Sequence, residues 1–525
     1  MEVKTFFFYD LETSGLNARA DRIMQFAGQR TNMDLEPIGE PVNLMVRMGE
    51  DVLPSPHALL VTGITPQMTL QDGYSEAEFA RRIYEEFFTP DTIVVGYNNV
   101  RFDDEFLRYL FWRNFWDPYE WAWKDGRSRW DLLDVVRMTR ALRPEGIKWP
   151  SEKKPVWRDG EVVEGEFEMV ATNRLELITK LNKIGHEKAH DALSDVEALI
   201  DVAKLIREKQ PQLFEYLLRM REKKAVQGMV NLDEPREFVY VSGRYDRQWE
   251  KATVAWPLAS GRNGGVVVYD LRYDPTELIG MGKEELREFL FERRGPVVAS
   301  AGTEKSLANR HSQTSVPCDK NRHSLSNPAE TTSGRDEHIM PRAVIKELRD
   351  NRCPAVAPIG VLEQDGGWER IGLDLRTVRE NKRKLLVAEG FAEMVQDIFM
   401  EREGFESGGD AEERLYESFL SDRDRVKCEA VRNAGVDELA DFHPEFVDER
   451  LVEMLVRYKA RNFPKSLSAD EALMWETWRE GRIREQLPKY AAELAKLATT
   501  TDGADGQFVL QELQLWLERV VPTDY

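Results

Sequence analysis

The sequence lacks any apolar run long enough to cross a membrane, and it has little cysteine. The longest apolar stretches, such as Phe6–Tyr9 and Ile93–Tyr97, are strand-length, whereas a spanning helix needs about 20 residues. The three cysteines, Cys318, Cys353 and Cys428, are far apart and odd in number, which argues against a disulfide framework and for a reducing compartment. Because the first residues show no signal-peptide pattern, we expect a cytoplasmic protein without a membrane segment.

The chain also has fewer basic than acidic residues. The 525 residues include 73 Lys and Arg against 94 Asp and Glu, which gives a formal net charge of −21. This balance argues against a protein that coats nucleic acid non-specifically, because such binding depends on Lys and Arg neutralising phosphates. It still permits a local basic groove on an acidic protein. The length is too great for a single core and predicts several domains.

Patterning along the chain predicts three domains. Residues 1–210 alternate strand-like and helical segments and are expected to be α/β. Residues 211–368 contain short Val- and Tyr-rich runs bounded by Gly and Pro, which predict a small antiparallel β-unit. Residues 369–525 show amphipathic helical spacing throughout and are expected to be all-α. Within the second domain, residues 301–338 contain no aromatic residue and are rich in Ser, Thr and Asn, so we expect a disordered insertion there.

Apolar periodicity predicts the individual elements. Strands are expected at Val3–Tyr9, Ile23–Arg30, Val42–Arg47 and Thr92–Tyr97, with returning strands within Val344–Pro358. Helices are expected at Ser75–Phe88, Asp104–Trp112, Ser128–Leu142, Asn173–Ile184, Asp191–Glu208 and Lys283–Glu292. In the C-terminal region they are expected at Lys382–Phe399, Ala411–Leu420, Pro444–Tyr458, Ala469–Arg484, Leu487–Leu497 and Phe508–Val520.

Two acidic residues end the first apolar strand. Asp10 and Glu12 are two positions apart, and residues i and i+2 of a strand lie on the same face, so both carboxylates can reach one ion. Such a pair alone is a weak signal, because exposed strands often alternate acids. Here the pair follows a run that should be buried, where carboxylates are costly without a partner, so a cation or a base is expected nearby.

A third acidic position has two interpretations. Asp103 follows the strand expected at Thr92–Tyr97 and lies near a helix start. It is equally compatible with a metal ligand and with a helix N-cap, since Asp is favoured at that position. Of the two adjacent acids, either Asp104 is the better candidate for the cap, or the two divide the roles of cap and ligand.

His190 and Asp195 lie five residues apart around another expected helix start. A histidine just before a helix can project over a site that the helical Asp also reaches, and imidazole is the usual general base near neutral pH. The alternative is a surface histidine beside a capping Asp191. Carboxylate oxygens suit Mg²⁺, and a pair of such ions can hold both oxygens of a phosphodiester cleavage, which makes a metal-dependent nuclease the leading hypothesis.

The residues of these segments, and their order along the chain, resemble the motifs of a known family. DLETSG at residues 10–15, NNVRFD at residues 98–103 and HDALSD at residues 190–195 resemble the three motifs of the exonuclease superfamily named after its Asp, Glu, Asp, Asp and final His (DEDDh). Longer segments resemble the bacterial exodeoxyribonuclease I family: GYNNVRFDDEFLRYLFWRNFWDPY, RWDLLDVVR, ALRPEGIKWP and YKARNFP. The likeness covers nearly the whole chain except residues 301–338.

The resemblance implies a multidomain fold: an α/β ribonuclease-H-like exonuclease domain, an SH3-like β-barrel domain and an all-α C-terminal domain. It implies 3′→5′ hydrolysis of single-stranded DNA to 5′-mononucleotides with two Mg²⁺ ions, for which Mn²⁺ is a possible substitute, in DNA repair and recombination. By motif matching, the expected metal ligands are Asp10, Glu12, Asp103 and Asp195, and the expected base is His190. Glu12 and Arg174 are expected to contact the terminal nucleotide.

The segment from Tyr97 to Trp130 is rich in aromatic residues, with arginines in and after it. Sequence-tolerant single-strand binding combines aromatic platforms with a basic track. Most of these aromatics are expected to be core residues, Phe102, Phe106 and Phe111 among them, whereas Tyr119 and Trp123 lie in a Pro-flanked polar stretch that suits stacking. The family comparison implies DNA contacts at Arg108, Tyr119, Trp123, Arg137 and Arg143.

The resemblance also implies a protein partner, the acidic C-terminal tail of single-stranded DNA-binding protein, received near Arg143 and by the barrel. We expect a monomer. One rival function is a short-RNA exonuclease or a proofreading subunit, which would share the motifs but need neither the barrel nor the helical region. The other is a catalytically silent DNA-binding scaffold, which the intact acids and His190 argue against.

Overall fold

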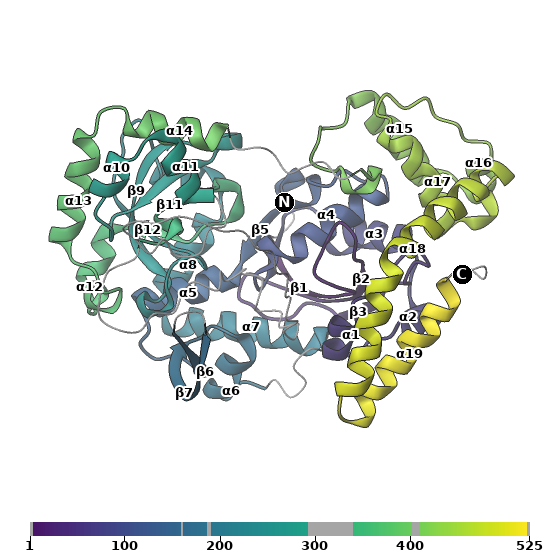
Figure 1. The fold of residues 1–525 in the computed structure, drawn as a ribbon, viewed down its shortest axis with the longest axis horizontal. Coiled ribbons are helices and arrows are strands. Elements are labelled where there is room, and N and C mark those ends of the chain that lie inside the picture. Colours follow the sequence, from purple (N-terminus) through teal and green to yellow (C-terminus); the bar gives the residue numbers. More distant parts are fainter. Residues whose placement is uncertain (1–3, 159–160, 186–190, 292–339, 402–408, 522–525) are drawn as a thin grey trace, which may run out of the picture. The chain divides into compact units, whose positions relative to one another are not determined.

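The computed structural model describes residues 4–158, 161–185, 191–291, 340–401 and 409–521 (Figure 1). The contacts between residues divide the chain into two compact units. Unit 1 comprises Met1–Asp131, Gly185–Asp201 and Phe405–Tyr525, and unit 2 comprises Leu132–Ile184 and Val202–Gly404. The expected domain boundaries after residues 210 and 368 stay predictions, and the insertion expected at residues 301–338 lies outside the described residues. In the part that is described, no helix is both long and apolar enough to cross a membrane.

Unit 1 contains a five-stranded mixed sheet with the order β3-β2-β1-β4-β5. Its strands are β1 (Thr5–Thr13), β2 (Ile23–Thr31), β3 (Val42–Met45), β4 (Thr92–Gly96) and β5 (Ser128–Asp131). The central strand β1 runs antiparallel to β2 and parallel to β4. Its residues Phe6–Tyr9 are buried, as expected of a strand covered on both faces.

Alternate side chains of β1 go to opposite faces of the sheet. Phe7, Tyr9 and Leu11 belong to a core that also contains Phe79 of α3 and Phe106 of α4. The other face therefore receives Phe6 and Phe8, and then the two acids at positions 10 and 12. The apolar run and the acidic pair thus share one strand, and the change from aromatic to acidic side chains falls near its carboxyl end.

Unit 1 also contains helices from the N-terminal, middle and C-terminal parts of the chain. They are α1 (Pro56–Thr62), α2 (Pro66–Asp72), α3 (Glu76–Arg82), α4 (Asp103–Arg113), the first residues of α7 (Ala192–Lys209), α15 (Asp422–Asn433), α16 (Val436–Ala440), α17 (Arg450–Asn462), α18 (Ala469–Thr500) and α19 (Ala504–Val520). A π-helical turn, Ile83–Phe87, continues α3. The short helices α1 and α2 were not expected from the sequence, although each carries Pro in its first turn, where its fixed φ suits a helix.

Unit 2 is organised around a five-stranded antiparallel sheet with the order β11-β10-β9-β8-β12. Its strands are β8 (Phe238–Val241), β9 (Ala252–Ser260), β10 (Val266–Asp270), β11 (Ile345–Leu348) and β12 (Val356–Pro358). The expected β-unit and its returning strands are confirmed. A separate two-stranded sheet, β6 (Ser151–Arg158) with β7 (Glu161–Ala171), was not expected from the sequence.

The helices of unit 2 flank these sheets. They are α5 (Leu132–Leu142), α6 (Leu175–Asn182), the remainder of α7, α8 (Pro211–Met220), α9 (Lys223–Met229), α10 (Thr276–Gly280), α11 (Lys283–Phe291), α12 (Gly367–Arg370), α13 (Leu375–Val387) and α14 (Phe391–Met400). The prediction of a single helix at Lys382–Phe399 is wrong, because the helix is interrupted between α13 and α14. Gly390 occupies the break with φ of 74°, a left-handed conformation that favours glycine.

Three other expectations about helices are wrong, in where a helix begins or in where one is interrupted. Ser128–Asp131 do not begin a helix; they pair with β4 as a parallel strand, and Trp130 stacks on Phe6 with ring centroids 6.3 Å apart. Ala411–Leu420 forms only a short turn, and the helix begins after Ser421, whose hydroxyl accepts a hydrogen bond from the Asp424 amide. The two helices expected at Ala469–Arg484 and Leu487–Leu497 are one helix, α18, with Pro488 inside it.

Candidate functional site

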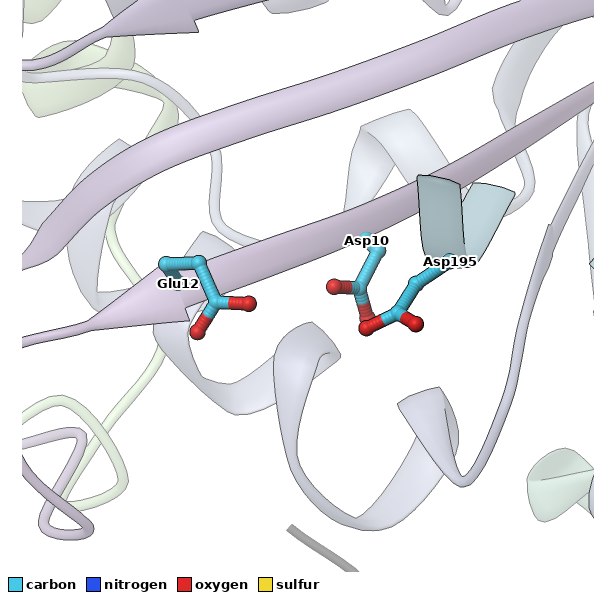
Figure 2. Close-up of side chains that lie close together, drawn as sticks. All are labelled: Asp10, Glu12 and Asp195. Carbon is cyan, nitrogen blue, oxygen red and sulfur yellow. The ribbon is translucent and has the colours of Figure 1, made fainter. Parts of the chain in front are cut away.

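Asp10, Glu12 and Asp195 form an acidic group in unit 1. Each offers one carboxylate oxygen, and these oxygens all lie within 4.8 Å of one another. Figure 2 shows the carboxylates of Asp10 and Asp195 turned toward each other, with Glu12 beside them. Glu12 is buried, while Asp10 and Asp195 are partly exposed. Sequence reasoning predicted this set as metal ligands, and the structure brings three of the four predicted ligands together.

The local structure explains why these side chains meet. Asp10 and Glu12 extend from the same face of β1, and the regular pairing with β2 shifts between Glu12 and Thr13. Asp195 belongs to the first turn of α7. Asp191 fixes the start of that helix, because its Oδ2 accepts a hydrogen bond of 3.3 Å from the Ser194 amide. His190, the predicted base, lies outside the described residues.

The chemistry of this donor set fits a hard divalent cation. Three carboxylates at such short separation repel one another when all are ionised, and burial of Glu12 increases the cost of its charge. A cation removes both penalties. Mg²⁺ and Mn²⁺ take oxygen ligands of this kind, and a partly exposed site leaves room for water and substrate phosphate.

Asp103 lies at the start of α4 and is buried. It is not a helix N-cap, because Phe102 occupies that position and no side chain caps the helix. It also does not belong to the three-residue group found among the described residues. Its charge nevertheless reaches β1, since Asp103 contributes to raising the pKa of Tyr9, after burial and after Asp104. Asp103 therefore lies beside the acidic strand without joining the close group.

Asp104 is the residue for which the sequence-based prediction was wrong. It was the better N-cap candidate, yet its side chain is fully buried and points into the domain. Asp104 Oδ1 accepts hydrogen bonds from the Tyr9 hydroxyl at 2.7 Å and from Asn99 Nδ2 at 3.3 Å. Its other oxygen pairs with Arg129 of β5. These partners link β1, α4 and β5 directly behind the acidic group.

The predicted DNA contacts in unit 1 lie partly in one aromatic and basic cluster. The Arg108 guanidinium carbon is 5.7 Å from the centroid of the Tyr119 ring. Phe419, which was not selected from the sequence, contacts Tyr119 in an edge-on arrangement with ring centroids 5.7 Å apart, and it is 79% exposed. Trp123 is 63% exposed. Phe102, Phe106 and Phe111 are buried core residues, as predicted.

Phe419 could not be found from the sequence by its own pattern. The segment around it was expected to be a helix, in which an aromatic residue would have been assigned to a buried face. The observed irregular backbone between Glu413 and Ser421 exposes it instead.

Three predicted contacts belong to unit 2. Arg137 on α5 pairs with Asp134 at 2.6 Å. Arg143 donates hydrogen bonds to the carbonyl oxygen of Val361 at 3.2 Å and to Gln364 at 2.7 Å. Arg174 occupies the N-cap position of α6, where it pairs with Glu176 and lies 3.8 Å from Glu152. Each arginine is thus held in place by neighbours, and their roles toward a substrate stay predictions.

Three family profiles match successive parts of the chain. Residues 7–203 match the family described as exonuclease, which includes all four predicted acidic ligands and His190. Residues 221–305 match the exonuclease I SH3-like domain, and residues 409–520 match the exonuclease I C-terminal domain. Together with the observed sheets and helices, these matches confirm the predicted fold class.

Proteins that match nearly the whole length of the chain are consistent with these family matches. The chain is 36% identical to exodeoxyribonuclease I of Haemophilus influenzae over 512 residues, which cover 97% of each sequence. Two solved structures of Escherichia coli exonuclease I each superpose with a TM-score of 0.83 and cover 99% of this chain and 100% of theirs. One, at 34% identity, is a complex with a dA16 oligonucleotide; the other, at 33%, is a zinc-bound complex with single-stranded DNA.

Proposed function

Because the chain belongs to the exodeoxyribonuclease I family, we propose that it degrades single-stranded DNA from the 3′ end and releases 5′-mononucleotides. The observation that carries the proposal is the group of three carboxylates at the end of β1 and the start of α7, inside the region that matches the exonuclease family. A group of this composition is suited to metal-assisted phosphodiester hydrolysis.

Asp10, Glu12 and Asp195 would hold Mg²⁺, with Mn²⁺ as a possible substitute, and Asp103 would complete the ligand set for a pair of ions. When bound, the ions supply charge stabilisation at the phosphate and the leaving 3′ oxygen. The chain's own contribution is to fix the carboxylates on a rigid strand and helix, so that little reorganisation accompanies the reaction. His190 is proposed as the base that takes the proton from the attacking water.

The DNA would be held by stacking and by phosphate contacts. Tyr119, Trp123 and Phe419 are exposed or half-exposed aromatic residues of unit 1, and bases of any sequence stack on such rings. Arg108, Arg137 and Arg143 would contact phosphates, and Glu12 and Arg174 the terminal nucleotide; guanidinium groups suit phosphate oxygens well.

We further propose that this enzyme acts as a monomer in the cytoplasm during DNA repair and recombination, and that it binds the acidic C-terminal tail of single-stranded DNA-binding protein near Arg143. The support for these points is the family membership. A binding measurement between the purified chain and that tail peptide, with an Arg143→Ala variant, tests the partner.

The activity is tested with a 5′-labelled single-stranded DNA oligomer and the Asp195→Asn variant. The wild type should shorten the DNA stepwise from the 3′ end with Mg²⁺ present, and the variant should lose at least about a hundredfold in rate, because one metal ligand is replaced by a neutral amide. Glu197→Gln on the same helix is the matched control, since Glu197 is exposed, and it should cleave normally. Near-normal rates in Asp195→Asn with saturating Mg²⁺ would contradict the site.

The same assay separates the rival functions. A matched RNA oligomer degraded faster than DNA would favour the RNA exonuclease. Tight binding of DNA without any Mg²⁺-dependent product would favour the silent scaffold.

A further inference from the structure

The hairpin of β6 and β7 in unit 2 carries chemically different side chains on its two faces. The register pairs Ser151 with Ala171, Lys153 with Met169 and Pro155 with Phe167. Directly paired residues of antiparallel strands project to the same side, so these six residues share one face, and none of them is acidic. The alternate positions, which include Glu152, Lys154, Glu166 and Glu168, form the opposite face.

The face without carboxylates is exposed and aromatic. Phe167 is 52% exposed and Met169 is 67% exposed. The Lys153 ammonium nitrogen lies 4.1 Å from the centroid of the Phe167 ring, close enough for a cation–π contact. Large apolar side chains exposed together on a small sheet, with a lysine beside them, are typical of a binding surface.

The opposite face joins the hairpin to a predicted substrate residue. Glu152 lies 3.0 Å from Lys154, 3.8 Å from Arg174 and 3.8 Å from Arg247. The chain also runs directly from the end of β7 at Ala171 to Arg174 at the start of α6. The hairpin is therefore anchored, through its acidic face, to the arginine that is proposed to contact the terminal nucleotide.

From this arrangement we propose that the face of Lys153, Phe167 and Met169 binds single-stranded DNA. A base stacks on the Phe167 ring, Met169 extends the apolar platform, and the Lys153 ammonium contacts an adjacent phosphate. The inference rests on the proposed function. DNA fits better than an acidic or apolar protein segment because a flat exposed ring beside a cation is the pair that non-specific single-strand binding uses. In a chain with a net charge of −21, a polyanion also needs a face from which carboxylates are excluded.

The experiment measures binding apart from cleavage. Fluorescence anisotropy of a 5′-fluorescein oligothymidylate is recorded in EDTA for four proteins: wild type, Phe167→Ala, Lys153→Ala and Lys180→Ala. Phe167→Ala should weaken binding about tenfold, as loss of one stacked base does. Lys153→Ala should reduce the dependence of log Kd on log salt by about 0.7. Lys180→Ala is the matched control, since it removes the same charge from an exposed lysine of unit 2 outside the hairpin, and it should bind as the wild type does.

Phe167→Trp should restore the affinity lost in Phe167→Ala, because a larger ring keeps the platform, whereas Phe167→Leu should not. Thermal melting of each variant checks that the fold is unchanged, as expected for exposed side chains. Equal affinities of Lys153→Ala, Lys180→Ala, Phe167→Ala and wild type would overturn the inference. Failure of the proposed function is a separate result, namely no cleavage of DNA by the wild type with Mg²⁺.

Discussion

The Tyr9 hydroxyl donates a hydrogen bond of 2.7 Å to Oδ1 of Asp104, across 95 positions of the sequence. Tyr9 immediately precedes Asp10 on β1, and Asp104 immediately follows Asp103 on α4. Burial, and then the charges of Asp104 and Asp103, raise the pKa of Tyr9 well above its ordinary value. The phenol therefore stays protonated and remains a donor, so this buried bond fixes the acidic strand against the helix that carries Asp103.

Removing the two ends of this bond should have unequal effects. Tyr9→Phe keeps the ring packed and leaves Asp104 with Arg129 and Asn99 as partners, so the free energy of unfolding should fall by about 1 kcal/mol. Asp104→Asn removes the carboxylate that pairs with the buried Arg129 guanidinium and should cost more, about 3–5 kcal/mol. Urea unfolding of the two variants measures both values. A smaller loss in Asp104→Asn than in Tyr9→Phe would contradict the assigned roles.

Binding of Mg²⁺ to the acidic group should increase the stability of the folded protein. Because Mg²⁺ would bind the folded acidic group and not the unfolded chain, its addition should raise the free energy of unfolding, by about 2.7 kcal/mol at a hundredfold excess over Kd. Asp10→Asn should lose most of this increase. Glu197→Gln should keep it, because Glu197 lies on the same helix as Asp195 but is exposed. Thermal unfolding with and without Mg²⁺ gives the comparison, and an equal shift in Asp10→Asn would refute the assignment.

The sequence predicted the acidic strand well because the relevant physics is local. Period-two alternation alone places Asp10 and Glu12 on one face, and the apolar run before them marks a central strand. Asp195 meets them through tertiary folding; the pattern around His190 allowed such a shared site, and the resemblance to a known family predicted it. The same limit explains Asp104: a local rule assigned it to a helix cap, whereas its partner Arg129 comes from β5.

The elements that were missed share a physical cause. β5 has helix-compatible residues but is recruited by pairing with β4, and tertiary pairing overrides local preference. The β6–β7 hairpin has frequent Lys and Glu, so its apolar alternation is weak, although its register keeps Phe167 and Met169 on one face. Residues 411–420 have helical spacing but a Ser421 cap starts the helix later.

Phe419 should contribute to DNA binding although it lies far from the acidic motifs in sequence. It is 79% exposed and contacts Tyr119, so Phe419→Ala should remove a stacking surface at little cost to the fold. We expect KM for single-stranded DNA to rise about tenfold with kcat nearly unchanged, the size of one lost stacking contact. Phe508→Ala, which truncates a phenylalanine of unit 1 that is 50% exposed, is the control. Equal kinetics for the two variants would exclude Phe419 from the DNA site.

A buried ion-pair network should make unit 1 sensitive to acid. Arg461 lies 2.9 Å from Asp51 and 2.6 Å from Glu412, and Arg22 lies 3.1 Å and 3.4 Å from the same two acids. Burial opposes ionisation of Glu412, but the charges of Arg461 and Arg22 prevail and lower its pKa from 4.5 to about 2. The same two arginines lower the pKa of Asp51.

Because these folded-state pKa values are depressed, the network stabilises the fold above the ordinary carboxyl pKa, and that stability is lost as pH falls. The free energy of unfolding should therefore decrease steeply from about pH 4.5 to the folded-state pKa of about 2. Glu412→Gln should be less stable at pH 7, by about 3–5 kcal/mol, because the paired arginines lose a counter-charge. It should also show a shallower loss on acidification, since one of the linked protons is gone. Thermal melting between pH 7 and pH 2 measures both effects, with the exposed Glu485→Gln as control; a pH dependence in Glu412→Gln as steep as in the wild type would rule out Glu412 as a source of the acid sensitivity.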